Sequence, residues 1–599
     1  MSSKPASTPS ARAARPARAL RADSPRVRRT LREVFGLQAL RAGQARAIDR
    51  VLGGLSTLLV MPTGAGKSLC YQLPALLLPG RTVVVSPLIA LMKDQCESLL
   101  ALGIDAVQLH SQLDGPAAQA AERAIAEGQA RIVLTTPERL ADEDCLRLLR
   151  SGPVSLVVVD EAHCISSWGH DFRPAFLEIA QGLRALGDPP VLALTATAAE
   201  AVAADIREAL AIPRGGHIDT GAYRPNLRLA VQPASDDADK RARALAIVAR
   251  SVGSGIVYAA TVRAAVELHA ALHDSGQAAA LYHGRLPAKE RQAAQDAFME
   301  DRVRVMVATN AFGMGIDKPD IRFVLHYQLP GGLDAYYQEA GRAGRDGEPA
   351  DCTLLFLRRD KAVQQFFLVG RYPQLDDIEA VYRALASPAP AGGWTLEAVR
   401  RRVQRPATKV RALLGMLVQR GIAERRRAGA PAQAEGDPAA IGQSAVHLRE
   451  DAAEPPDLAG LLMAYRDKRT HDHDALERMV FYAQTGQCRW QVLLAGLLED
   501  ADAAGTGRCG RCDNCERIAA HEAALAQPFV RAVEAALRPA GPAPSVFGAG
   551  RPVRVKRYGK GLVVSADATA VTIEFPDGSQ RSFDPHYVSL AGRGLNPAG

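Results

Sequence analysis

Residues 61–68, with the sequence MPTGAGKS, have glycine, lysine and serine at the spacing of a phosphate-binding loop. They follow the apolar segment 56–60, so backbone N–H groups of the loop would face phosphate oxygens. In such a loop Lys67 reaches the β- and γ-phosphates and the Ser68 hydroxyl binds Mg²⁺. The residues expected to contact the nucleotide are Thr63, Gly64, Ala65, Gly66, Lys67 and Ser68. The strict pattern has glycine where Met61 stands, so a glycine-rich loop without a ligand is the alternative for this segment alone.

A pair of carboxylates, Asp160 and Glu161, comes directly after the apolar run 156–159 (LVVV). Four successive apolar residues, mostly β-branched, predict a parallel strand buried on both faces. Ligands of open α/β sheets bind at the carboxyl ends of the strands. We therefore expect Asp160 to be a magnesium partner and Glu161 to be the base that orients a water molecule. A solvated acidic pair at a strand end is the alternative.

Two arginines, Arg342 and Arg345, follow the segment 336–339 (YYQE) and lie three residues apart, so in a helix they share one face. An arginine that neutralises charge on a transferring phosphoryl group raises the rate by about 10³–10⁵-fold. Together with the phosphate-binding loop and the acidic pair, the two arginines predict hydrolysis of a nucleotide. Ordinary surface charges are the alternative.

Four cysteines have the spacing of a metal site, because 20 residues separate Cys488 from the run Cys509-x-x-Cys512-x-x-Cys515. Four thiolates within tetrahedral reach suit structural Zn²⁺, whose binding contributes about 10–16 kcal/mol in small domains. Redox-active cysteines and an iron–sulfur cluster are the alternatives, since four thiolates do not select the metal. The clustering favours metal in a reducing compartment over disulfides.

The composition allows several cores, since the 599 residues are 47% hydrophobic and are enough for about four domains. The formal net charge is +8, but the first 29 residues hold eight Lys and Arg against Asp23, so the rest of the chain carries only +1. The overall charge is therefore weak evidence for nucleic-acid binding by the body of the protein. No run of 18 or more apolar residues occurs, so we expect no membrane span.

Residues 1–29 are rich in Ala, Arg, Pro and Ser and have little apolar surface to bury, which predicts a disordered basic tail. The tail lacks the apolar segment of a secretory signal. An arm that tethers the chain to nucleic acid and an organellar transit peptide are the two interpretations of its arginines.

From residue 30 to about 358, strand-like apolar runs alternate with longer helical patterns, which predicts parallel sheets. The runs are 56–60, 82–86, 131–135, 156–159, 191–194, 255–258, 303–307 and 323–325. The segment is too long for one nucleotide-binding unit, and the polar stretch 213–216 suggests a division there. We therefore expect two tandem α/β domains, residues 30–215 and 216–360, with ATP in the cleft between them.

The chain beyond the second α/β domain has other patterns. Residues 361–455 predict three helices followed by a hairpin with a disordered tip, which indicates a winged-helix-like domain; a helical bundle with a loop is the alternative. We expect a helical zinc-binding module at 456–520 and a linker at 521–545. Alternating apolar and polar residues predict a small SH3- or Tudor-like β-barrel at 546–595.

Through these motifs, residues 30–358 and 479–515 resemble a RecQ-type DNA helicase of the second helicase superfamily. Further matching segments are 35–44, 86–95, 136–140, 195–197, 307–317 and 482–489. The resemblance implies RecA-like sheet domains and ATP-dependent unwinding of duplex DNA by 3′-to-5′ translocation on a single strand. It also implies a role in DNA repair or recombination in the cytoplasm, at the nucleoid, and favours zinc at the cysteines.

The resemblance assigns roles to further residues. Gln44 would recognise adenine through its amide and Arg41 by stacking or hydrogen bonding, although Leu37 stands where many members have an aromatic residue. Asp317, in the motif at 307–317, would join the ATP site.

A loop directly after the acidic pair is similar to the family's aromatic-rich loop, which contacts DNA bases and reports that contact to the ATP site. The residues that would contact DNA are Trp168, His170, Phe172 and Arg173. Stacking of bases on aromatic rings is sequence-tolerant and contributes about 1–3 kcal/mol per base. Without the resemblance, Trp168 and Phe172 at this spacing fit core packing instead.

Two features depart from the family's usual pattern. The winged-helix-like segment precedes the cysteines, whereas in the usual order it follows them, so no residue can be assigned to a strand-separating hairpin. The C-terminal segment, with its entry strand and turn at 551–561, is similar to the small module of UvrD-type helicases. This similarity implies a protein partner, RNA polymerase or a repair protein. The basic residues equally allow nucleic-acid contact; they are Arg551, Arg554, Lys556, Arg557 and Lys560.

Two other functions stay open from the sequence. One is an RNA helicase, because Asp-Glu-Ala-His also occurs in RNA motors; the aromatic loop and the cysteines argue against it. The other is a non-catalytic scaffold that holds partners on DNA. The presence of Lys67, Asp160, Glu161 and Arg345 argues against a scaffold.

Overall fold

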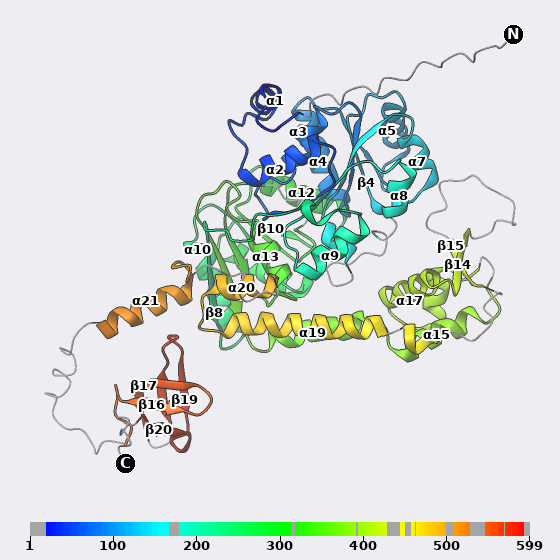
Figure 1. Cartoon of the computed structure of the whole chain (residues 1–599). Helices are drawn as coiled ribbons and strands as arrows, with labels where there is room; N and C mark the ends of the chain where they lie inside the picture. The colour runs from blue at the N-terminus through cyan, green and yellow to red at the C-terminus, as the bar shows by residue number, and fades with distance from the viewer. Residues whose placement is uncertain are drawn as a thin grey trace, which may run out of the picture.

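The computed structural model describes residues 20–166, 176, 179–313, 318–390, 393–427, 444–449, 457–461, 463–498, 507–526, 546–567 and 570–591. Along the chain it shows two α/β domains, a helical extension with a small α+β unit at its end, a helical cysteine-containing module and a small β-unit (Figure 1). Within the described ranges, none of the helices combines the length and apolar character needed to span a bilayer.

The first α/β domain is built on a parallel sheet that has seven strands in the described part of the chain, in the order β3-β4-β2-β5-β6-β1-β7. Its strands are β1 Thr57–Val60, β2 Arg81–Val85, β3 Ala106–Leu109, β4 Ile132–Thr135, β5 Val154–Val159, β6 Val191–Thr195 and β7 His217–Asp219. Successive residues of β2 enter two different cores, Val83 and Val85 on one face and Val84 on the other. The sheet is therefore covered on both faces, which explains its continuous apolar runs.

The helices of the first domain connect and cover these strands. They are α1 Pro25–Phe35, α2 Ala42–Leu52, α3 Leu69–Ala75, α4 Ile89–Ala101, α5 Gly115–Ala126, α6 Pro137–Leu140, α7 Glu143–Leu149, α8 Ile179–Ala185 and α9 Glu200–Ala209, with short 3₁₀ turns η1 Ala162–Ile165 and η3 Arg214–Gly216. Because β5, β6 and β1 are neighbours, the loops after these three strands meet at one edge of the sheet.

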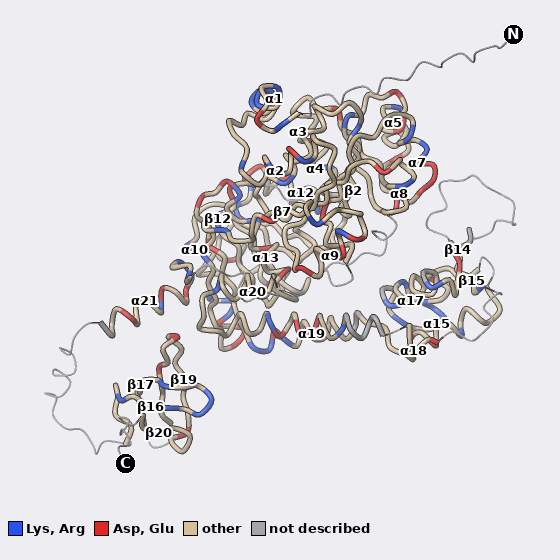
Figure 2. Tube along the Cα trace, in the orientation of Figure 1, with Lys and Arg blue, Asp and Glu red and all other residues tan. Residues whose placement is uncertain are grey.

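The second α/β domain has a six-stranded parallel sheet in its described residues, in the order β10-β11-β9-β12-β13-β8. Its strands are β8 Leu227–Pro233, β9 Ser254–Tyr258, β10 Ala279–Tyr282, β11 Val305–Ala308, β12 Ile321–His326 and β13 Ala350–Phe356. Its helices are α10 Asp237–Arg250, α11 Val262–Asp274, α12 Ala288–Met299 and α13 Leu333–Ala340. Both parallel sheets confirm the predicted fold class. Basic and acidic residues are interspersed along both domains (Figure 2), in line with the near-neutral charge predicted outside the tail.

A helical hairpin extends from the second domain. Helix α14 (Asp360–Arg371) packs against the long helix α19 (Met463–Gln484), with an ion pair of 2.5 Å between Lys361 Nζ and Glu477 Oε1. A unit with its own core is inserted between these two helices, at the far end of α19 in Figure 1. The inserted position explains why this unit precedes the cysteines: it interrupts a hairpin whose second helix leads to Cys488.

The inserted unit contains the three helices and the hairpin that the pattern of 361–455 predicts, and its described residues include one further short helix, α18. Its elements are α15 Leu375–Leu385, α16 Leu396–Val403, α17 Ala407–Gln419, β14 Ala423–Arg427, β15 Ser444–Leu448 and α18 Leu458–Leu461. β14 and β15 pair antiparallel, and Trp394 adds a bridge to Val446, so the helices pack beside a small sheet. The predicted disordered tip of the hairpin lies outside the described residues.

The cysteine-containing module is not a separate body but shares a core with the second α/β domain. Its helices are α20 Arg489–Leu498 and α21 Asp513–Ala526. Trp490 Nε1 donates to the Leu227 carbonyl at 3.2 Å, and the Val231 N–H donates to Asp513 Oδ2 at 2.9 Å. The module therefore covers β8, an edge strand of the second sheet.

The C-terminal segment forms a curled antiparallel sheet with five described strands in the order β19-β18-β17-β16-β20. The strands are β16 Pro552–Val555, β17 Gly559–Ala566, β18 Val571–Glu574, β19 Gln580–Phe583 and β20 Val588–Leu590, with the 3₁₀ turn η5 Pro585–Tyr587. Its core includes Val553, Val563 and Phe575. One contact with the cysteine-containing module joins His521 Nδ1 and Glu574 Oε1 at 3.4 Å.

Several predicted boundaries differ from the structure. The predicted winged-helix-like range 361–455 includes most of α14, which packs against α19, and the predicted module 456–520 includes α18, which belongs to the inserted unit. The tail predicted for 1–29 overlaps α1, because Ser24 caps that helix and Val27 is buried while the neighbouring arginines face solvent. The first sheet extends past the predicted division near 215, since β7 pairs with β1. The predicted linker starts inside α21, which continues to Ala526.

Candidate active site and metal centre

The loop after β1 adopts backbone conformations that require glycine at two positions. Gly64 and Gly66 have φ of +76° and +85°, in the left-handed region. A Cβ atom on Gly66 would lie 2.5 Å from Gln44 Nε2, and one on Gly64 would lie 2.7 Å from Arg345 Cγ. The loop is thus confined between α2 of its own domain and an arginine of the second domain.

Lys67 lies between this loop and the acidic pair. Its ammonium donates to the Met61 carbonyl at 3.0 Å and to the Pro62 carbonyl at 3.4 Å. Burial lowers the pKa of Lys67, while the nearby carboxylates of Glu161 and Asp160 act in the opposite direction. The structure therefore brings the lysine and both carboxylates, from loops after β1 and β5, into one site. Ser68 directly precedes α3.

The acidic pair is held in a constrained conformation at the end of β5. Asp160 is 9% exposed, and its Oδ1 accepts from the Glu161 N–H at 3.0 Å. Burial raises the pKa of Asp160, with the Glu161 carboxylate as the second cause. Glu161 has φ of +49°, a left-handed conformation that costs a non-glycine residue on the order of 1–3 kcal/mol. The buried Glu161 Oε2 accepts no hydrogen bond within the described part of the chain.

His163 connects the acidic pair to the loop after β6. Its Nδ1 lies 3.1 Å from Thr195 Oγ1, which donates to the Thr197 carbonyl at 2.9 Å. The same Nδ1 is 3.4 Å from Glu161 Oε2, close enough for an ion pair when the imidazole is protonated. Movement of the loop at Thr195–Thr197 would therefore shift His163 and, through it, change the surroundings of the Glu161 carboxylate.

The two predicted arginines do not share a helix face, because α13 ends at Ala340 and both lie in the turn that follows it, where they have different neighbours. Arg345 contacts the phosphate-binding loop at Gly64. Arg342 is 6% exposed, and its Nε has no hydrogen-bond partner among the described residues. Arg342 lines a cleft of about 1100 Å³, together with His163 and Thr197 of the first domain and Asn310 of the second.

The residues predicted to recognise adenine lie beside the phosphate-binding loop. Gln44 is 5% exposed, and its amide nitrogen donates to the Ala65 and Gly66 carbonyls at 3.2 and 3.1 Å. Its Oε1 accepts from the Arg41 N–H at 2.9 Å, at the start of α2. Arg41 and Leu37 are exposed. Gln44 thus links the start of α2 to the loop.

Several predicted site residues lie outside the described residues: Trp168, His170, Phe172, Arg173 and Asp317. The described residue before the aromatic-rich loop, Ser166, is anchored to α9 by a 2.6 Å hydrogen bond from its Oγ to Asp205 Oδ2. Ser166 is therefore held to α9, and Val202 of that helix lines the same cleft as Arg342.

One residue of this region has no sequence signal: Arg224, in the segment that joins the two sheets. Its guanidinium donates to the Thr63 carbonyl at 2.7 Å and to the Gly344 carbonyl at 2.7 Å. An isolated arginine in a connecting segment matches no motif, so only the tertiary structure reveals that it lies between the phosphate-binding loop and the loop of Arg342 and Arg345.

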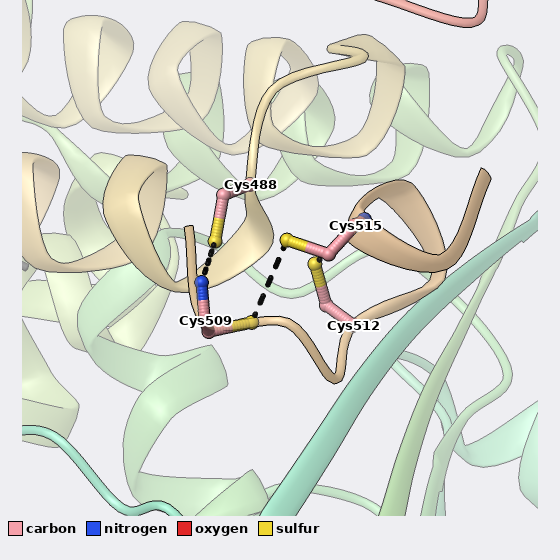
Figure 3. Close-up of side chains that lie close together, drawn as sticks. All are labelled: Cys488, Cys509, Cys512 and Cys515. Atoms are coloured by element: carbon pink, nitrogen blue, oxygen red, sulfur yellow. Dashed lines mark hydrogen bonds between the residues drawn. The ribbon is translucent and has the colours of Figure 1, made fainter. Parts of the chain in front are cut away.

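The four predicted cysteines converge at the base of α20 and α21 (Figure 3). Their sulfur atoms all lie within 4.8 Å of one another, and the Sγ atoms of Cys509 and Cys515 are 3.8 Å apart. Tetrahedral Zn²⁺ with Zn–S bonds of about 2.3 Å needs S···S separations of about 3.8 Å. The arrangement therefore fits a tetrahedral metal ion.

Backbone groups around the cysteines support the same assignment. The Cys509 N–H donates to Cys488 Sγ at 3.3 Å, and the Arg489 and Cys515 N–H groups donate to Cys512 Sγ at 3.4 Å. Such donors stabilise thiolates and orient them toward a metal. The buried Arg489 guanidinium is paired with Asp513 at 2.9 Å, which ties α20 to α21.

The fold and the site together define a motor-type ATPase with two RecA-like domains, and comparisons with known proteins agree. Residues 41–206 match the DEAD/DEAH box helicase model and residues 239–347 match the helicase conserved C-terminal domain. Residues 456–516 match the RecQ zinc-binding model.

Sequence relatives define the family. The chain is 33% identical over 508 residues to the ATP-dependent DNA helicase RecQ of Synechocystis, an alignment that covers 82% of this chain and 99% of the relative. It is 40% identical to the probable ATP-dependent DNA helicase RecS of Bacillus subtilis, over 60% of this chain and 73% of the relative. It is 44% identical to the ATP-dependent DNA helicase RecQ of the same species, over 57% of this chain and 58% of the relative. The chain belongs to the RecQ family of helicases.

Proposed function

We propose that this protein is an ATP-dependent DNA helicase that unwinds duplex DNA by 3′-to-5′ translocation on a single strand, in repair or recombination. The observation that supports it most directly is the contact of Arg345, from the second domain, with Gly64 of the phosphate-binding loop in the first. A site completed by both domains links nucleotide turnover to their relative movement, which is what a translocating motor requires.

The residues of the site divide the work of hydrolysis. Bound Mg²⁺ would neutralise phosphate charge, with Ser68 and Asp160 holding it. Lys67 would bind the β- and γ-phosphates. Glu161, whose buried Oε2 accepts no hydrogen bond from the described residues, would orient water. Arg345 and Arg342 would stabilise the charge that develops on the transferred group.

Nucleotide specificity and coupling to DNA rest on neighbouring residues. We assign adenine recognition to Gln44 and Arg41, and a further contact at the ATP site to Asp317. DNA contact is assigned to Trp168, His170, Phe172 and Arg173 by their resemblance to the family's aromatic-rich loop. Thr195 and His163 would transmit a change in the loop after β6 to Glu161.

The remaining modules have supporting roles. The four cysteines would hold Zn²⁺, favoured by their tetrahedral spacing and by the RecQ zinc-binding match. The C-terminal β-unit would bind a protein partner, RNA polymerase or a repair protein, and the chain would act in the cytoplasm at the nucleoid. Residues 545–599 used as bait should retrieve a protein; retrieval of DNA alone would reject this assignment of the β-unit.

The decisive experiment for the motor replaces the phosphate-binding lysine. Lys67→Ala should bind single-stranded DNA normally but lose ATP hydrolysis and unwinding of a tailed duplex, whereas Lys289→Ala, at an exposed position on α12, should keep all three activities. Unwinding by Lys67→Ala protein would disprove the role of Lys67.

The same assay separates the alternative functions. Single-stranded DNA should stimulate ATP turnover more strongly than RNA of the same length. Stronger stimulation by RNA would indicate an RNA helicase, and absence of any nucleic-acid-stimulated turnover in the wild-type protein would indicate a scaffold. The direction of translocation is measured with duplexes that carry a single-stranded tail on either the 3′ or the 5′ side. Unwinding of the duplex with the 3′ tail alone is the result expected for 3′-to-5′ movement.

A further inference from the structure

Arg224 lies in the segment between β7 and β8, at the junction of the two α/β domains, and is 9% exposed. Its guanidinium contacts both domains. On the first-domain side, one terminal nitrogen donates to the Thr63 carbonyl of the phosphate-binding loop at 2.7 Å. On the second-domain side, the guanidinium donates to three carbonyls, those of Gly341, Ala343 and Gly344, at 3.3, 3.0 and 2.7 Å.

The three carbonyls on the second-domain side belong to the loop that contains Arg342 and Arg345. Asn226 adds two hydrogen bonds to the same loop, from its amide nitrogen to the Gly344 and Glu348 carbonyls at 2.8 and 2.9 Å. Gly344 has φ of +54°, and a Cβ there would lie 2.5 Å from the Asn226 amide nitrogen. The loop thus has a fixed shape that Arg224 and Asn226 determine.

The two loops that Arg224 joins also touch directly. A Cβ on Gly341 would lie 3.4 Å from Thr63 Cβ, and Arg345 packs on Gly64. These direct contacts are packing contacts between the two loops, whereas the Arg224 guanidinium forms hydrogen bonds with both. Separation of the domains would break the bond to Thr63 and leave the three bonds to the second domain in place.

We propose that Arg224 is a positioning residue for ATP hydrolysis: it fixes the loop of Arg345 against the phosphate-binding loop when the two domains close. This inference rests on the proposed function, since it assigns Arg224 a role only through Arg345. The planar guanidinium suits the task because it offers five donors in a fixed fork and stays charged, while a lysine ammonium is a single flexible donor point.

A double-mutant cycle on the full-length protein tests this proposal. The variants are Arg224→Gln, Arg345→Ala and the double variant, with Arg263→Gln as the matched control, because Arg263 is an exposed arginine of the second domain that pairs only with its helix neighbour Glu267 among the described residues. Hydrolysis of radiolabelled ATP is measured in single-turnover and steady-state modes, with saturating single-stranded DNA. Melting temperature and DNA affinity are recorded for each variant.

The expected result is a lower kcat with little change in the KM for ATP. Arg224→Gln should lower kcat at least tenfold while the KM for ATP and the Kd for DNA stay within about threefold, and Arg224→Lys should restore part of the loss. In the Arg345→Ala background the same substitution should change kcat by less than twofold, because a residue that acts through Arg345 has nothing left to position.

Two results would overturn the inference. The first is that Arg224→Gln keeps the wild-type kcat while Arg345→Ala is inactive. This result would reject the role of Arg224 but leave the proposed function intact. The other is a full tenfold loss from Arg224→Gln in the Arg345→Ala background, the sign of a structural role independent of Arg345. If Arg224→Gln does not fold, Arg224→Lys takes its place in the cycle. Its smaller loss of kcat should likewise disappear in the Arg345→Ala background, and an undiminished loss there would overturn the inference. Wild-type kcat in Arg345→Ala would instead remove the proposed role of Arg345, and this inference with it.

Discussion

Backbone conformation at single residues determines how the candidate active site is shaped. The left-handed φ of Gly64 and Gly66 allows the phosphate-binding loop to approach Arg345 and Gln44 closely. Glu161 has the same kind of conformation without being glycine, so its position is maintained against local strain. Strain of this kind persists only where surrounding contacts over-determine it. At Glu161 the fixed neighbours are Asp160, whose carboxylate accepts its N–H, and His163.

The base role assigned to Glu161 predicts a specific kinetic defect. Glu161→Gln keeps the size and backbone of the residue but removes the charge that orients water. We expect kcat for DNA-stimulated ATP hydrolysis to fall by about 10²-fold or more, with the KM for ATP changed only a few-fold. Glu143→Gln, at an exposed position on α7, is the control. A kcat within threefold of the wild type for Glu161→Gln would show that another group orients the water.

At the scale of elements, the inserted α+β unit is stabilised by a buried carboxylate at the start of α15. Asp377 accepts from the Gln374 N–H at 3.0 Å, from Arg405 at 2.6 Å and from Lys409 at 3.0 Å. Burial raises its pKa, but these three donors outweigh burial and hold the pKa of Asp377 below the usual range. One carboxylate therefore joins α15 to α17 and to the turn before it.

The lowered pKa of Asp377 predicts a pH dependence of this unit. Ionised Asp377 contributes stability above its unfolded pKa, near pH 4, and the contribution is lost as the pH falls through the lower folded pKa. Asp377→Asn should destabilise the unit by about 1–2 kcal/mol at pH 7. The difference from the wild type should shrink below about pH 4.

Hydrogen exchange of α15 and α17 in the full-length protein measures this effect locally. The exposed neighbour substitution Asp376→Asn is the control. Unchanged protection of α17 in Asp377→Asn at pH 7 would contradict the assigned contribution, as would a difference that persists unchanged in acid.

At the scale of the whole molecule, the cysteine-containing module is part of the motor rather than an appendage. It shares a core with the second sheet, and Trp490 and Asp513 hydrogen-bond directly to β8. Because β8 is an edge strand, the module also covers backbone that would otherwise face solvent. The inserted α+β unit, by contrast, is connected through α14 and α19 and has its own core (Figure 1).

This shared core predicts that metal loss spreads into the second domain. Cys512→Ala should reduce the zinc content from one ion per chain to none, and should speed hydrogen exchange in β8 and β13 while β1 and β5 stay protected. Cys145→Ala, a buried cysteine of the first domain, should keep the zinc. Loss of zinc with unchanged protection of β8 would mean that the module folds independently of the sheet. Retention of zinc by Cys512→Ala would contradict the metal site itself.

Sequence patterns predict best those features that depend on residues close together in the chain. Each predicted strand of the two sheets is present, because strands buried on both faces must be apolar at successive positions. Five described strands of the two sheets have no predicted counterpart. Four of them, β3, β7, β8 and β10, lie at sheet edges, where fewer positions need to be apolar. The fifth, β13, lies inside the second sheet, between β12 and β8. Cys488, Cys509, Cys512 and Cys515 converge as their spacing predicts.

By itself, then, the sequence determined the phosphate-binding loop, the acidic pair, the cysteine cluster and the two-sheet class, since each depends on residues near one another in the chain. The tertiary structure decided what depends on long-range contact. It placed Arg345 on Gly64, inserted the α+β unit within a helical hairpin, and brought Arg224 between two loops. Such contacts join residues more than a hundred positions apart. A backbone carbonyl accepts a hydrogen bond whatever its side chain is, so the type of the accepting residue does not reveal the contact.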